Sequence, residues 1–124
     1  DPEDEISWND YGMAFLNLAL LSNDPAHKEN SRFFFENAEQ KILQSISLGS
    51  IHAYYNLACL YALTERPAEA IQFLEKAEQC NALPPTDDVI HDEWLDGLRD
   101  HQGYRMFIAR LLNKQDRDDP SDPD

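Results

Sequence analysis

The spacing of apolar residues restricts the fold of this chain more than any other feature. From about residue 6 to residue 112, apolar side chains recur every three or four positions, the spacing of one face of an α-helix. No segment alternates apolar and polar residues with period two, and no Asn-Gly type of turn joins two apolar runs, so β-structure is not expected. We therefore predict an all-α fold, with helices over about 6–21, 31–48, 51–63, 67–80 and 103–114 and a further segment around 89–98.

Prolines, a glycine and a serine mark where these helices begin and end. Pro25 stops the first predicted helix, and Gly49 is placed to terminate the second because glycine accepts the left-handed conformation that closes a helix. Ser50 is a good N-cap for the third helix. Pro67 falls in the first turn of the fourth, where no amide donor is needed.

Acidic residues are concentrated at the two ends of the chain. The 124 residues fit one domain and carry a formal net charge of −14. Residues 1–5 and 116–124 are rich in acids and proline and lack apolar side chains, so we expect acidic disordered tails around a helical domain of residues 6–115. A further acidic stretch, residues 87–100, lies inside that domain. Because phosphate binding needs clustered Lys and Arg, we do not expect a nucleic-acid partner.

The cysteines and the apolar runs bear on location. Cys59 lies in an apolar helical run and Cys80 at the end of another, so we expect two free thiols in a reducing compartment, and hence a cytoplasmic protein. The longest apolar stretch, residues 13–21, is interrupted by Asn17 and is too short to span a bilayer, so no membrane insertion is expected. The chain starts at Asp1 without an initiator methionine, which is typical of a processed chain or of a piece excised from a longer protein.

Small residues stand at matching positions in two parts of the chain. The stretch WNDYGMAF, from Trp8, and the stretch YNLACLY, from Tyr54, share one template of bulky and small residues. On the helix after the second stretch, Ala70, Leu74 and Ala77 form a small-large-small pattern. Two antiparallel helices approach closely only where one presents a small residue to a large residue of the other. The small residues therefore mark predicted contacts between paired helices.

This pattern resembles the tetratricopeptide repeat (TPR), which residues 54–77 match without an insertion. An earlier unit also matches, but Phe15 and Ala38 are 23 positions apart where Tyr61 and Ala70 are 9 apart, so it carries about 14 extra residues. The segment DEWLDGLRDHQGYRMFIARL is similar to the acidic-Leu-Arg tail that ends many bacterial repeat domains. The resemblance implies a TPR-like α-solenoid of antiparallel helix pairs, with repeat one over about 6–49, repeat two over about 50–80 and capping helices over about 86–114.

The resemblance also implies a function in protein binding, because the first helices of successive TPR units line a concave groove. Asn56 matches the asparagine that family members use to fix an extended peptide backbone. We therefore expect a noncatalytic module that binds a peptide or partner protein, without a cofactor or a metal. The residues expected to line the groove are Asn9, Met13, Asn17, His52, Tyr55, Asn56, Cys59 and Leu63.

The charge around this groove bears on the kind of partner. Some TPR proteins clasp the acidic C-termini of chaperones with Lys and Arg, but the corresponding positions here are Asn9, Met13, His52 and Tyr55. The acidic stretch 87–100 instead favours a basic or amphipathic partner. An alternative within the same family is an acidic secretion chaperone that cradles an exported client. A homo-oligomer is also open, since short repeat arrays with exposed end faces often self-associate.

A further alternative, from a different class, is a metal-dependent hydrolase. The stretch HDEWLDGLRDH, from His91 to His101, is rich in groups that bind divalent cations, although a solvated acidic face explains it as well. No two histidines have the spacing of an HExxH motif, and the sequence has no GxSxG motif, P-loop or dinucleotide-binding fingerprint. We therefore expect no enzymatic activity.

Overall fold

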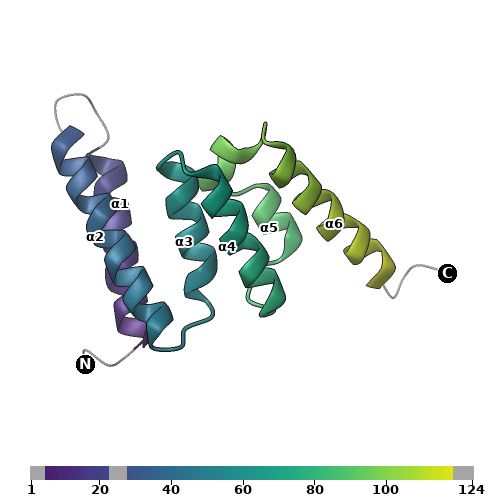
Figure 1. Cartoon of the computed structure of the whole chain (residues 1–124), viewed down its shortest axis with the longest axis horizontal. Coiled ribbons are helices and arrows are strands. Elements are labelled where there is room, and N and C mark those ends of the chain that lie inside the picture. The colour runs from purple at the N-terminus through teal and green to yellow at the C-terminus, as the bar shows by residue number, and fades with distance from the viewer. Residues whose placement is uncertain (1–4, 23–27, 119–124) are drawn as a thin grey trace.

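The computed structural model describes residues 5–22 and 28–118, and all regular secondary structure in these residues is helical. The predicted all-α class is confirmed. Figure 1 shows the helices side by side in chain order, with the α1–α2 pair at one end of the molecule and α6 at the other. The elements are α1 (Glu5–Leu21), α2 (Lys28–Ser47), α3 (Ala53–Leu63), α4 (Pro67–Gln79), α5 (Thr86–Ile90), the 3-10 helix η2 (Glu93–Leu98) and α6 (Gln102–Asp118).

Two helices are longer than the sequence predicts. α2 begins at Lys28 rather than near residue 31, and α6 continues to Asp118 rather than ending near residue 114. Residues 116–118, expected to be disordered, are therefore helical, because each residue added to an existing helix gains a backbone hydrogen bond without a new nucleation cost. Glu5, also expected to be disordered, is the first residue of α1. The rest of the predicted tails, residues 1–4 and 119–124, and the predicted helix stop at Pro25 lie outside the described residues.

α1 and α2 pack along their length as the first helix pair. Gly12 lies at a close contact between them: a Cβ atom there would stand 2.7 Å from Cγ1 of Ile42 and 3.2 Å from the carbonyl oxygen of Ala38. Ile42 and Ala38 are fully buried, so they have little room to move away. The small residue of the WNDYGMAF stretch therefore lies at a helix contact, as predicted.

α3 and α4 form the second pair. Ala58, Ala70 and Ala77 have no exposed surface, which fits their predicted role in letting the two helices approach. Beside them, the rings of Tyr61 and Phe73 lie 5.7 Å apart between centroids and add aromatic contact across the pair.

α2, α3 and α4 end with the same backbone motif. The residue that follows the last helical turn, Gly49, Glu65 or Asn81, has a positive φ of 102°, 60° or 55°. The next amide donates to the carbonyl oxygen five positions earlier, at 3.1 Å from Ser50 to Ser45 and at 2.8 Å in the other two turns. These bonds use carbonyl groups that a helix end otherwise leaves without partners. The predicted role of Gly49 is confirmed.

Ser50, predicted to cap the third helix, has a different role. The N-cap of α3 is His52, whose side chain makes no capping hydrogen bond. Ser50 is buried, and its amide closes the end of α2. The prediction of an N-cap at Ser50 is wrong because the turn between α2 and α3 is two residues longer than that role requires.

α5, η2 and α6 cover the side of the second pair that faces away from α1 and α2. η2 packs against α3, while α6 contacts α4 and α5. Val89, Leu95, Leu98 and Phe107 are all buried, so these elements share a hydrophobic core with the two helix pairs. The segment predicted around residues 89–98 is thus the end of α5 followed by η2, and η2 packs against α3.

Candidate functional site

The eight predicted groove residues do not form one open surface. Asn9 on α1 and Asn56 on α3 hydrogen-bond to each other, with Nδ2 of Asn56 donating to Oδ1 of Asn9 at 3.0 Å. The amide that the resemblance assigns to a peptide backbone therefore already has a partner within the chain. Its bond connects α1 to α3.

Tyr55 and Cys59 lie in the interior, beneath the start of η2. The Tyr55 hydroxyl donates to Oδ2 of Asp92 at 2.5 Å, and the Cys59 thiol donates to the same oxygen at 3.9 Å. The other carboxylate oxygen of Asp92 accepts from the amide of Trp94 at 3.0 Å, which caps η2. Burial first, and then the neighbouring groups, raise the pKa of Tyr55 and of Cys59 well above their ordinary values. Both groups therefore stay neutral, and both are buried.

The other predicted groove residues are scattered. Met13 and Leu63 are half-buried against the core. Asn17 is exposed, and its amide donates to the carbonyl oxygen of Met13 at 3.1 Å. His52 is exposed at the start of α3. A partner-binding role for these residues stays a prediction. Leu63 also lines a different surface, together with residues of α2.

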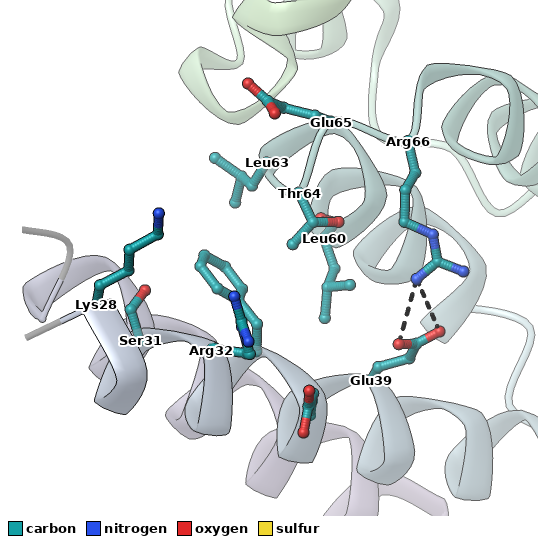
Figure 2. A pocket seen from close by; sticks show the side chains of 11 residues that line it. Lys28, Ser31, Arg32, Glu39, Leu60, Leu63, Thr64, Glu65 and Arg66 are labelled. Atoms are coloured by element: carbon teal, nitrogen blue, oxygen red, sulfur yellow. Dashed lines mark hydrogen bonds and ion pairs between the residues drawn. The ribbon is translucent and has the colours of Figure 1, made fainter.

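An open pocket of about 620 Å³ lies between α2 and the end of α3. The two helix pairs diverge toward the start of α2 (Figure 1), and Figure 2 shows the side chains that face the space between them. One wall comes from the first half of α2, and the other comes from the last turn of α3 and the turn that follows. The lining residues are Lys28, Ser31, Arg32, Phe35, Glu36, Glu39, Leu60, Leu63, Thr64, Glu65 and Arg66.

The base of this pocket is apolar and fixed in place. Leu60 is only 1% exposed, and Phe35 and Leu63 pack against the same core. The hydroxyl of Thr64 donates to the carbonyl oxygen of Leu60 at 2.9 Å, and the hydroxyl of Ser31 donates to the carbonyl oxygen of Ala19 at 3.2 Å. The lining hydroxyl groups are therefore occupied by the protein's own backbone.

One end of the pocket is closed by a network of charged groups. Glu39 accepts hydrogen bonds from Arg66 at 3.2 and 3.3 Å (Figure 2) and from the Tyr61 hydroxyl at 2.8 Å. Arg66 also donates to Glu69 at 2.6 Å, and its guanidinium carbon lies 4.2 Å from the centroid of the Tyr61 ring. Burial, followed by the bond to Glu39, raises the pKa of Tyr61, so this hydroxyl remains a donor. The charged groups at this end of the pocket are therefore paired with one another.

The opposite end holds two cations without such bonds. Lys28 and Arg32 are exposed and stand four positions apart, on one face of α2. In the part of the chain that the structure describes, neither makes an ion pair or a side-chain hydrogen bond. Neither was among the site residues predicted from the sequence, although their four-residue spacing on one helix face is visible there.

Comparison of the chain with models of known protein families, with curated proteins and with solved structures found no match. Within residues 5–22 and 28–118, no three His, Cys, Asp or Glu side chains come together as a metal site would need. In the same residues, no helix has the length and apolar character that crossing a bilayer requires. His91 and His101 are both exposed, and His27 lies outside the described residues.

Proposed function

We propose that this chain is a noncatalytic protein-interaction module of the TPR type, and that its partner inserts a peptide segment into the pocket between α2 and α3. The observation that carries the proposal is the contrast between two surfaces. Tyr55, Asn56 and Cys59 of the expected groove are used in contacts within the chain. The pocket is open, has a volume of about 620 Å³ and is apolar at its base.

The fold supports a binding role in a second way. The apolar base of the pocket is held by buried contacts, so Phe35, Leu60 and Leu63 are already in position. Such preorganisation lowers the entropy lost on binding. The repeated helix ends at Gly49, Glu65 and Asn81 are spaced by 16 positions each (65 − 49 and 81 − 65), which supports an array of similar units.

A peptide-selection experiment with a structural readout tests the proposal. Random peptides would be selected on the immobilised chain, and the enriched peptides titrated into isotope-labelled protein for NMR. We expect the amide signals of residues 28–39 and 60–66 to shift. Shifts confined to Asn9, Asn17 and His52 would move the site back to the expected groove, and failure to enrich any peptide would contradict a binding role.

A further inference from the structure

Resting on the proposed function of the pocket, we infer that its ligand is an acidic-apolar peptide segment, in which Lys28 and Arg32 bind a carboxylate and Phe35, Leu60 and Leu63 take an adjacent apolar side chain.

Lys28 and Arg32 differ from nearly all other cations in the described chain. With Lys28 and Arg32 set aside, every described Lys or Arg side chain but that of Lys114 has an acidic or aromatic partner. These pairs are Lys41 with Trp8 and Tyr11, Arg66 with Glu39, Glu69 and Tyr61, Lys76 with Phe73, Arg99 with Asp96, Arg105 with Asp100, and Arg110 with Glu78 and Phe107.

A shortage of acidic residues does not explain why Lys28 and Arg32 have no acidic partner within the described residues. The chain has 24 acidic residues against 10 basic ones, and Glu36 follows Arg32 by one helical turn. Pairs at that spacing commonly interact on a helix, yet Arg32 and Glu36 form no ion pair in the described structure. Figure 2 shows Lys28 and Arg32 rising from α2 on the side that faces Leu63. Both charges are therefore available at the pocket.

The charged groups around the pocket favour one kind of anion. A guanidinium group offers two parallel donors to a carboxylate, and a lysine beside it adds a second positive charge. Glu36 and Glu65 also line the pocket, so its rim repels a ligand of high negative charge. A carboxylate with one charge suits this mixed rim better than a phosphate group with nearly two.

The charges at the two ends of the pocket determine the direction of the ligand. Arg66 is already bound by Glu39 and Glu69, so the far end of the pocket has no free cation to attract an acid. Leu60 and Leu63 lie between the two ends. The carboxylate would thus lie toward the start of α2 and the apolar side chain toward the centre. This chemistry is acidic and amphipathic, whereas the sequence alone favoured a basic or amphipathic partner.

The test uses blocked octapeptides with a central Leu-X-Leu in a Gly-Ser background, where X is glutamate, glutamine or phosphoserine. Dissociation constants would be measured from NMR shifts of the full chain at low and high salt. We expect the glutamate peptide to bind about 2- to 30-fold more tightly than the glutamine peptide, the range for two exposed ion pairs. Salt should reduce this preference.

Two variants test whether Lys28 and Arg32 cause the preference for the glutamate peptide. The double variant Lys28→Gln/Arg32→Gln should lose it and keep the wild-type melting temperature, because both side chains are exposed and form no ion pair or side-chain hydrogen bond within the described residues. Lys114→Gln, which removes an exposed cation of α6 that has no ion pair within the described residues, should retain it. Equal binding of the two peptides, a preference that survives in the double variant, or tightest binding of phosphoserine would each overturn the inference.

The same spectra separate this inference from the proposed function. If all peptides shift the pocket amides equally, the carboxylate preference is wrong but the pocket remains the binding site. If the peptides shift only signals elsewhere, or none, both proposals are wrong.

Discussion

The Tyr55 hydroxyl donates a hydrogen bond to Oδ2 of Asp92 at 2.5 Å, across 37 positions of the sequence. This bond ties α3 to the start of η2 and places a neutral phenol under a carboxylate that also caps η2 through Trp94. It explains why a surface expected to be open is covered. It also makes the position of η2 testable by single substitutions.

Tyr55→Phe should destabilise the fold by about 1 kcal/mol, because it removes a hydrogen bond to a charged acceptor that is only partly buried. Chemical denaturation would measure the change, and hydrogen exchange should be faster at the η2 amides. Tyr54→Phe is the matched control, since no hydrogen bond of the Tyr54 hydroxyl is present in the described structure. An equal loss in both variants would contradict a specific role for the bond to Asp92.

Ala58→Leu and Ala70→Leu should each destabilise the protein by about 1 to 3 kcal/mol, because extra atoms at fully buried positions force α3 and α4 apart. Melting curves followed by circular dichroism would measure the effect. Ala68→Leu, at an exposed position of α4, should leave the melting temperature nearly unchanged. Wild-type stability in both buried variants would exclude close packing at these residues.

Gly12→Ala should also destabilise the fold, although alanine is the better helix former by about 1 kcal/mol. The new methyl group would meet the buried Ile42 side chain at 2.7 Å, and it would approach backbone atoms of α2. Gly103→Ala is the control, because its nearest neighbour is the end of the Ile71 side chain at 3.2 Å. Denaturant titration should show a loss at the first position and little loss, or a gain, at the second.

Glu65→Gly should stabilise the protein by about 0.5 to 1 kcal/mol, since Glu65 has a φ of 60° that costs a residue with a Cβ atom more than it costs glycine. The reverse change in the equivalent turn, Gly49→Ala, should be destabilising at a φ of 102°. Thermal unfolding of the two variants provides the comparison. If Glu65→Gly is less stable than the wild type, the glutamate side chain stabilises the fold by more than its positive φ destabilises it.

The two thiols should differ in reactivity. Iodoacetamide should modify the exposed Cys80 in the native protein and leave the buried Cys59 unmodified until the chain unfolds, as mass spectrometry of digested protein would show. Because burial and Asp92 raise the pKa of Cys59, mild alkali should not expose it to attack in the folded state. The stability contributed by the neutral thiol is present below its unfolded pKa of about 8.5 and falls as the pH rises above that value. Modification of Cys59 at the rate of Cys80 would contradict its placement under η2.

The helices of this protein follow from the sequence, because apolar periodicity and turn residues such as Gly49 are local information. The covered surface at Tyr55 and the pocket between α2 and α3 do not follow from the sequence. Tyr55 is closed off by Asp92, and the pocket brings Arg32 beside Leu63, 31 positions later in the chain (63 − 32). Both depend on how successive helices tilt against one another. A periodic pattern shows which face of a helix is buried but does not show which distant element covers it.

The pocket is bounded by two helix pairs that meet mainly where α2 contacts α3. A ligand of the proposed kind would touch Arg32 on one pair and Leu63 on the other, so its affinity would depend on the angle between the pairs. Thermodynamic reciprocity requires that such a ligand also favour that angle by the same free energy. Occupancy of the pocket would then stabilise one orientation of the α1–α2 pair relative to the α3–α4 pair.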